Sequence, residues 1–221
     1  MKIAIIGVGH IGTNLAHQFA SKGHLVTLAF SRDEQRLQAL AQQLGSHVQA
    51  ASPAVAASQA KVIVLSVPWN LLDMALSQMG QVHGKIVIDA TNPFSQGLVD
   101  LEGLSSLAFN QRRLPGAKIA KAFNTLTAGF QAEVAAGEHR PIAMFYSALA
   151  SEADDVCREL ISAMGFVPVA LEGSAEVLME APRREGAIYG EGYTPSDAER
   201  IAQAARHDLA EASRLANTLK Q

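Results

Sequence analysis

The chain has 221 residues, a formal net charge of −3, and a composition that is 48% hydrophobic and 18% charged. This composition excludes an intrinsically disordered chain, and the small negative charge argues against a nucleic-acid-binding surface. The longest apolar runs, such as 62–67, are no longer than a strand, and the first residues do not read as a signal peptide. The single cysteine, Cys157, excludes an intrachain disulfide. We therefore expect a cytoplasmic protein without a membrane or nucleic-acid partner.

The first ninety residues alternate between strand and helix patterns. Strands are expected at 2–6, 25–30, 47–50, 61–66 and 85–89. Helices are expected at 14–21, 33–44 and 71–79, with a short one opening at Ser52-Pro53. Residues 91–97 read as a loop, and 99–113 show no pattern that assigns them to helix or strand.

The second half continues the alternation more loosely. Strands are expected at 118–122, 142–146 and 166–170, and helices at 154–164 and 196–219. Alternating strands and helices predict an α/β fold, a doubly wound Rossmann sheet that is mainly parallel. We expect residues 1–130 to form the dinucleotide-binding domain. Residues 131–221 are expected to extend the same sheet with further strands and helices and to shape a substrate pocket.

A glycine-rich turn follows the first strand. Gly7, Gly9 and Gly12 form the pattern G-x-G-x-x-G, with His10 and Ile11 between the last two glycines. The pattern has more weight here because it follows a strand and opens a helix. Gly7 permits the tight turn, Gly9 lets a diphosphate approach the backbone, and Gly12 allows close helix packing. The alternative is a glycine-rich turn without a ligand.

The residues after the second strand favour NADP over NAD. NAD-binding folds usually place an acidic residue at this strand end, and none stands there. Ser31, Arg32 and Arg36 offer a hydroxyl and two guanidinium groups to a 2′-phosphate, and the two arginines are one helical turn apart. Two alternatives stay open: Asp33 could act as the ribose acid of an NAD site, and Ser31 with Glu34 could form a capping box.

Three later strand ends are expected to meet at the same edge of the sheet, where such folds bind ligands. Val67 and Pro68 could form a wall for a nicotinamide ring, and Trp69 could stack on a ligand or pack inside the fold. Hydrogen bonds to the nicotinamide amide or to a second substrate are expected from four polar residues: Thr91, Asn92, Asn124 and Thr125. We find no firm catalytic acid or base, and His83 and His139 lie in separate loops, which argues against a metal site.

These segments resemble the F420-dependent NADP oxidoreductase family, and the reductase domain of the STEAP metalloreductases is similar. The matching stretches are 5–12, 31–32, 67–69, 89–93 and 121–125. The resemblance implies that Ser31, Arg32 and Arg36 hold the 2′-phosphate. It also implies that Val67, Pro68 and the 124–128 turn lie near the nicotinamide and the incoming ring. A homodimer is a further implication, without a surface assigned to it.

The expected function is hydride transfer between NADPH and a flavin or deazaflavin, with F420, FMN or FAD as the second substrate. Hydride transfer needs proximity and orientation rather than a strong acid in the protein. The alternatives are an NADPH-dependent reductase of a small carbonyl or imine, and a non-catalytic NADP(H) sensor. The polar, glycine-rich stretch 183–193 leaves the second substrate open, and its Tyr189 and Tyr193 are candidates to cover a pocket or to lie on the surface.

Overall fold

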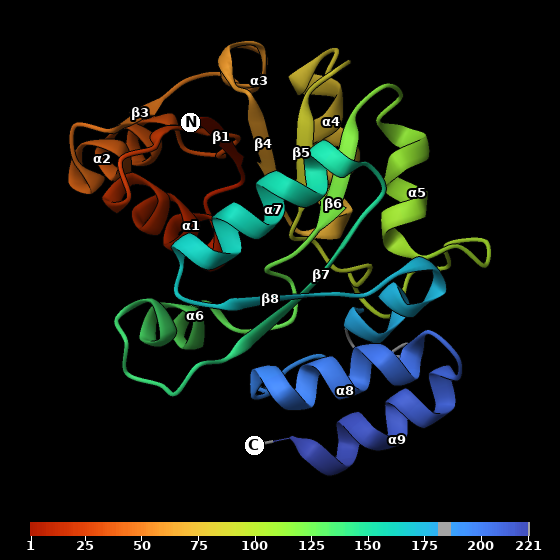
Figure 1. Cartoon of the computed structure of the whole chain (residues 1–221). Coiled ribbons are helices and arrows are strands. Elements are labelled where there is room, and N and C mark those ends of the chain that lie inside the picture. Colours follow the sequence, from red (N-terminus) through yellow and green to blue (C-terminus); the bar gives the residue numbers. More distant parts are fainter. Residues whose placement is uncertain (181–186, 221) are drawn as a thin grey trace.

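The computed structural model describes residues 1–180 and 187–220. Within these residues, eight strands form one sheet in the order β3-β2-β1-β4-β5-β6-β7-β8 (Figure 1). The strands are β1 (Lys2–Ile6), β2 (Leu25–Ala29), β3 (Val48–Ala50), β4 (Val62–Leu65), β5 (Ile86–Asp89), β6 (Lys118–Lys121), β7 (Ala143–Ala148) and β8 (Val167–Ala170).

The first six strands are parallel, and the sheet changes direction at β7. β1 pairs with β2 on one side and β4 on the other, so the chain winds outward in both directions from its first strand. β6 and β7 are antiparallel, and β7 and β8 are parallel to each other. The expected doubly wound, mainly parallel sheet with C-terminal strands added at one edge is confirmed.

The helices agree with most of the expected ranges. They are α1 (His10–Ser21), α2 (Glu34–Leu44), α3 (Pro53–Gln59), α4 (Leu72–Met79), α5 (Ser106–Arg113), α6 (Ala128–Ala135), α7 (Ser151–Ala163), α8 (Pro195–Ala205) and α9 (Leu209–Leu219). Two short 3₁₀ helices, η1 (Trp69–Leu71) and η2 (Gly173–Met179), follow β4 and β8.

Two helix expectations need correction, and two further helices were not predicted. α1 begins at His10 rather than at residue 14, because the glycine turn leads directly into the helix. The single helix expected at 196–219 is two helices, because the Asp208 side chain accepts hydrogen bonds from the backbone N–H groups of Ala210 and Glu211 and starts a new helix. α5 lies within the stretch that the pattern did not assign, and α6 was not expected at all.

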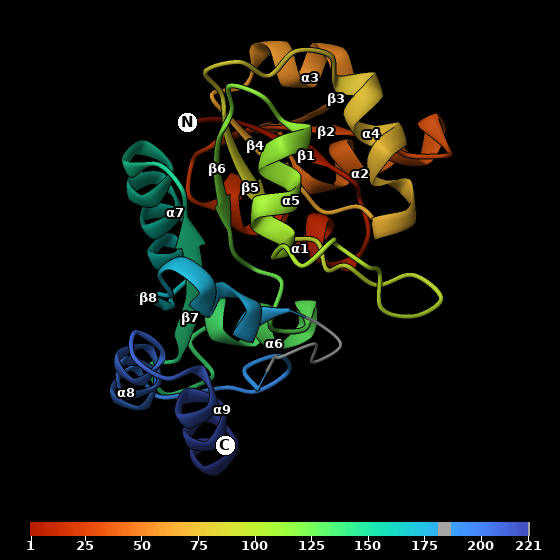
Figure 2. The ribbon, with the colours of Figure 1, turned by 90° about the vertical axis from the view of Figure 1, so that its right-hand side faces the viewer.

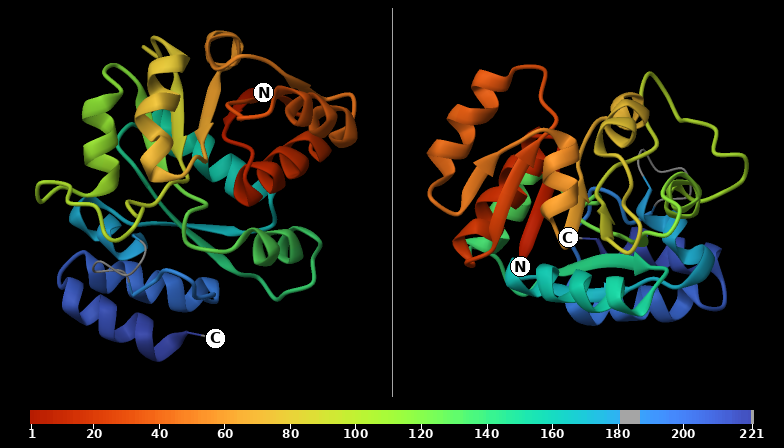
Figure 3. Two further views of the ribbon diagram at one scale, coloured as in Figure 1. Left: turned by 180° about the vertical axis from the view of Figure 1, so that it is seen from behind. Right: turned by 90° about the horizontal axis from the view of Figure 1, so that it is seen from above.

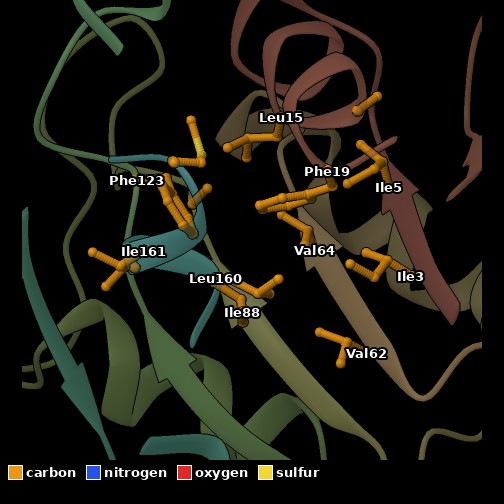
Figure 4. Close-up of a cluster of buried hydrophobic side chains, with 14 of the residues drawn as sticks. Ile3, Ile5, Leu15, Phe19, Val62, Val64, Ile88, Phe123, Leu160 and Ile161 are labelled. Atoms are coloured by element: carbon orange, nitrogen blue, oxygen red, sulfur yellow. The ribbon is translucent and has the colours of Figure 1, made fainter. Parts of the chain in front are cut away.

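One apolar cluster fills the sheet face that α1 and α7 cover. Figure 4 shows side chains of β1, β4 and β5 meeting those of α1 and α7, with Phe19 and Phe123 edge to face at 6.1 Å between ring centroids. The cluster includes residues on both sides of position 130, among them Ile3 and Leu160. α7 therefore covers the strands of the N-terminal half with residues from the C-terminal half.

Helices α3, α4 and α5 cover the opposite face, as the view from behind in Figure 3 shows. A third cluster lies beyond β7, where Ala143 and Phe145 face α8, α9 and η2. Met144 and Tyr146 alternate with them and face the first cluster. Figure 2 shows α8 and α9 stacked beside β7 and β8, away from the parallel strands.

None of the helices in the described ranges combines the length and the apolar character that crossing a membrane requires.

Candidate functional site

The glycine turn lies between the end of β1 and the start of α1, and its three glycines differ in their surroundings. Gly7 has a positive φ of 104°, and a Cβ there would lie 2.7 Å from the carbonyl oxygen of Ser66. A Cβ on Gly12 would lie 2.0 Å from the carbonyl oxygen of Gly7. A Cβ on Gly9 would meet no atom within 4 Å. Gly7 and Gly12 are thus required by packing, whereas Gly9 keeps free space open above the backbone.

The N-terminus of α1 faces this free space. Gly9 is the N-cap residue, and no side chain caps the helix. The first N–H groups of α1 and the positive end of its dipole therefore remain available to an anion. His10 is exposed and Ile11 is half-buried beside this end. The turn has the open backbone that a diphosphate group requires.

A first pocket of about 350 Å³ opens at the ends of β2 and β3. Its lining residues are Phe30, Ser31, Glu34, Leu37, Gln38, Ala51, Ser52, Pro53 and Gln78. We call it the β2 pocket. Phe30 has a φ of 65°, a left-handed conformation that bulky residues rarely adopt. The chain therefore turns sharply at the end of β2 and carries Ser31 into the pocket wall.

The polar side chains that follow Phe30 have different roles. Asp33 is the N-cap of α2, and its carboxylate accepts a hydrogen bond of 2.9 Å from the backbone N–H of Arg36. The Ser31 hydroxyl bonds to the backbone of Asp33 instead of capping the helix, so the Ser31–Glu34 capping box was wrong. Arg32 precedes the helix, which removes the argument that helical periodicity places Arg32 and Arg36 on one face.

Both arginine side chains remain available to a ligand. Arg32 and Arg36 are exposed, and neither guanidinium makes an ion pair or hydrogen bond with a residue in the described ranges. The Asp33 carboxylate, by contrast, caps α2 by accepting a backbone hydrogen bond. The end of β2 therefore offers two unpaired guanidinium groups and a hydroxyl; Arg32 and Arg36 do not line the β2 pocket itself, whereas the exposed Glu34 does.

A second pocket of about 490 Å³ lies on the other side of the glycine turn. Its lining residues are Gly9, His10, Ile11, Ser66, Val67, Pro68, Trp69, Ala90, Thr91, Asn92, Phe94 and Tyr189. We call it the β4–β5 pocket. Ser66 joins it to the turn, because its hydroxyl donates a 2.8 Å hydrogen bond to the carbonyl oxygen of Gly7. The pocket thus brings the glycine turn together with the ends of β4 and β5.

The two residues expected to form a wall, and Trp69 beside them, all line the β4–β5 pocket. Val67 is buried, Pro68 is exposed, and both line the β4–β5 pocket. Trp69 is mostly buried, with its ring 6.2 Å from that of Phe109 and the guanidinium of Arg113 5.9 Å from its centroid. Trp69 therefore packs inside the fold with one part of its ring and reaches the pocket with another.

The four polar residues expected near the second substrate separate into two groups. Thr91 and Asn92 line the β4–β5 pocket, whereas Asn124 and Thr125 do not. Asn92 and Asn124 bond to each other, with the Asn92 amide donating to the carbonyl oxygen of Asn124 and the Asn124 amide donating to Asn92 Oδ1. Asn124 also donates to the carbonyl oxygen of Met179. The asparagine pair therefore joins the ends of β5 and β6 to η2.

Thr125 faces the interior. Its hydroxyl lies 4.0 Å from the sulfur of Met144, and the side chain is buried. The expected role of Thr125 at the substrate side therefore has no support from its position. Thr91 is different, because its backbone N–H and hydroxyl both donate to Asp89 Oδ1 while the residue forms part of the pocket wall.

A buried ion pair supports this wall from behind. Lys121 is fully buried, with its Nζ atom 3.3 Å from Asp89 Oδ2 and 2.7 Å from the carbonyl oxygen of Thr91. Asn110 donates a second hydrogen bond of 2.8 Å to Asp89 Oδ2. Removal of either partner of a buried ion pair strongly destabilises a protein. The pair therefore fixes the backbone at Thr91. Lys121 has a structural role here and does not reach the pocket.

Two further carboxyl groups lie near Lys121. Glu176 and Glu180 are both buried, and Oε2 of Glu176 has no hydrogen-bond partner within the described residues. Burial raises the pKa of Glu176 to about 7; Lys121 opposes the rise, whereas Glu180 and Asp89 add to it. The cluster thus contains one carboxyl group that gains or loses its proton near neutral pH.

Other residues singled out from the sequence lie away from the pockets. Tyr193 belongs to the core, where its hydroxyl donates to the carbonyl oxygens of Ala187 and Ala216, and Cys157 is buried in α7. His139 lies 2.9 Å from the carboxylate of Glu133. No group of three or more potential metal ligands occurs within residues 1–180 and 187–220. Arg183 and Arg184 lie outside the described residues.

Sequence reasoning missed several pocket residues. Phe30, Ala51 and Ser52 line the β2 pocket, and Ser66 and Phe94 line the β4–β5 pocket. The positions of Ala51 and Ser66, directly after strands, could have identified them, because this edge of the sheet binds ligands. Tyr189 was considered only as an alternative, and its contribution to the pocket depends on how the C-terminal segment folds back.

Comparison with known proteins gives the family. The profile of the family described as "NADP oxidoreductase coenzyme F420-dependent" matches residues 2–93. The hypothetical protein SMa0349 from Sinorhizobium meliloti is 31% identical, with a TM-score of 0.76, and the match covers 88% of this chain and 95% of that chain. The chain belongs to the F420-dependent NADP oxidoreductase family. It is therefore an NADP-dependent oxidoreductase.

A second solved structure agrees with this assignment. A protein from Arthrobacter sp. FB24, proposed to be an F420-dependent NADP-reductase, is 29% identical with a TM-score of 0.66, over 77% of this chain and 84% of that chain. The pyrroline-5-carboxylate reductase of Coxiella burnetii shares the fold, with 14% identity and a TM-score of 0.62, over 98% of this chain and 76% of that chain. No curated protein matches the sequence. The similarity to the STEAP reductase domain stays a prediction.

Proposed function

We propose that the two pockets and the glycine turn hold one NADPH molecule along the edge of the sheet. The β2 pocket would take the adenosine, with Ser31, Arg32 and Arg36 at the 2′-phosphate. The turn would take the diphosphate, because Gly9 leaves space there and the N-terminus of α1 faces it. The β4–β5 pocket would take the nicotinamide, with Val67 and Pro68 as its wall.

We further propose that the enzyme transfers a hydride between NADPH and a flavin or deazaflavin ring. NADPH, when bound, supplies the hydride from C4 of its nicotinamide. The observation that supports this acceptor is the β4–β5 pocket, whose volume of about 490 Å³ is in the range of small-molecule sites. Its described lining contains apolar and neutral polar groups together with His10, and it holds no carboxylate or lysine. Such a wall favours close stacking of two rings over acid–base chemistry on a polar substrate.

The residues of this chain would contribute to hydride transfer by holding the reacting rings in position. Thr91 is held by Asp89 and Lys121, and Asn92 is held by Asn124, so the pocket wall is rigid before a ligand arrives. We also propose the division into a dinucleotide-binding part, 1–130, and an extension, 131–221. The extension would act on the acceptor side, since it contributes Tyr189 to the pocket and Met179 to the Asn124 contact.

The acceptor is tested with NADPH carrying deuterium at C4. The purified protein is mixed anaerobically with this NADPH and, separately, with F420, FMN, FAD, a small ketone or a cyclic imine. We expect NADPH oxidation only with the ring acceptors, and we expect deuterium at C5 of reduced F420 when that acceptor turns over. Reactions without protein give the uncatalysed rate. Turnover restricted to the ketone or imine would show a carbonyl or imine reductase, and tight NADPH binding without any turnover would show a sensor.

A further inference from the structure

Phe94 and Tyr189 are two aromatic side chains that line the β4–β5 pocket. Phe94 is 46% exposed although it is large and apolar, and Tyr189 is half-buried. Neither ring contacts another aromatic ring within the described residues, and the Tyr189 hydroxyl has no hydrogen-bond partner there. Trp69, the other large aromatic side chain of this pocket, already packs against Phe109 and Arg113.

Backbone hydrogen bonds anchor the two segments that carry these rings. The N–H of Phe94 donates to the carbonyl oxygen of Asn92 at 2.7 Å, and Phe94 forms a β-bridge with Leu98. Around Tyr189, the N–H of Ile188 donates to the carbonyl oxygen of Leu178, and the N–H of Gly190 donates to that of Thr125 at 2.7 Å. Ordering of the backbone on either side therefore adds little to the entropy lost when a ligand binds.

The residues that line the pocket come from two groups of segments. Gly9 to Ile11 and Val67 belong to the glycine turn and the end of β4, which the proposed nicotinamide position uses. Phe94 and Tyr189 come from the loop after β5 and from the C-terminal segment, which that position leaves free. Both rings line the pocket, so a flat ligand bound there can contact them. Aromatic side chains bind flat ligands by offset or edge-to-face stacking.

We propose that Phe94 and Tyr189 bind the tricyclic ring of the hydride acceptor and set the preference of this enzyme for flat aromatic acceptors. The inference rests on the proposed function and deepens it. Flavins and deazaflavins share the tricyclic ring, so the same two side chains would serve either. Tyr189 acts through its ring, and its hydroxyl is not required for stacking.

The test measures ring binding separately from turnover. Riboflavin and F420 are titrated into the protein in the presence of saturating NADP⁺, and the dissociation constant is read from the quenching of the ligand's fluorescence. Phe94→Ala and Tyr189→Ala should each weaken binding about tenfold, as loss of one stacking side chain does elsewhere. Tyr189→Phe should bind as the wild type does. The dissociation constant for NADPH should stay unchanged in all three variants, which also shows that they are folded.

Leu98→Ala is the matched control, because Leu98 is 54% exposed on the same loop and does not line the pocket. It should bind both rings as tightly as the wild type. Wild-type affinity in both Phe94→Ala and Tyr189→Ala would overturn the inference, and so would an equal loss in Leu98→Ala. If these variants also transfer hydride to a flavin with an unchanged KM, the proposed function stands and only the role of the two rings fails. If the wild type neither binds nor reduces any tricyclic ring, both proposals fail.

Discussion

Gly12→Ala is expected to destabilise the protein by about 3 kcal/mol, the upper range for an overpacked site. The added methyl group would lie 2.0 Å from the carbonyl oxygen of Gly7 and 2.5 Å from the hydroxyl of Ser66. The first of these is a backbone atom at the end of β1, which cannot move without disturbing the centre of the sheet. Alanine gains about 1 kcal/mol in helix propensity over glycine, which is too little to offset this clash. Urea denaturation of the apo protein measures the effect.

Gly9→Ala is the matched control for this substitution. A Cβ on Gly9 meets no atom within 4 Å, and its φ of −72° suits any residue. We therefore expect the stability of the apo protein to change by less than about 1 kcal/mol, the usual range for an N-cap substitution. NADPH binding should be lost, because the methyl group occupies the space proposed for the diphosphate. An unchanged urea midpoint for Gly12→Ala would refute the packing argument, and normal NADPH affinity of Gly9→Ala would refute the diphosphate position.

Glu176→Gln is expected to stabilise the protein at pH 8 and to have little effect at pH 5. The pKa of Glu176 is about 7 in the fold, against an ordinary value of 4.5, because burial disfavours its charged form. Between these values the folded protein holds a proton that the unfolded chain has released, so stability falls as pH rises through this window. The difference between the two pKa values corresponds to on the order of 3 kcal/mol in the free energy of unfolding. This stabilisation is lost once the pH exceeds 7.

Glutamine carries no charge at either pH, so the stability of the variant does not fall in this way as the pH rises. Urea denaturation at pH 5 and pH 8 compares the free energies of unfolding of the variant and the wild type. Glu199→Gln provides the control, since Glu199 is exposed on α8 and makes no ion pair or side-chain hydrogen bond with another described residue. A stability difference between Glu176→Gln and the wild type that is the same at both pH values would show that the raised pKa is wrong.

The parallel part of the fold could be predicted because its strands are apolar on both faces and its turns are marked by glycine or proline. The C-terminal half was harder. α6 was missed because Ala128–Ala135 combines alanine, glycine and valine without a helical period, although Thr127 caps it. The break between α8 and α9 depends on the Asp208 cap, which the periodic apolar positions on both sides conceal.

The candidate site could be predicted in part from positions within two residues of a strand end, as for Gly7, Ser31 and Val67. Its remaining features depend on contacts between distant segments. The bonds between Asn92 and Asn124 join residues that follow neighbouring strands, and they hold Asn92 where it lines the pocket. Tyr189 reaches the pocket from a segment far along the chain, so no local pattern could place it there.

The central claim is that the cations after β2 select NADP(H) by its 2′-phosphate. Isothermal titration calorimetry of the wild type and Arg32→Ala with NADPH and NADH tests it most directly. We predict that the wild type binds NADPH far more tightly than NADH. Arg32→Ala should lose ten- to a hundredfold in NADPH affinity, the value of one or two charge-assisted hydrogen bonds, and little in NADH affinity. Equal losses for both nucleotides, or no heat from either with the wild type, would contradict the account.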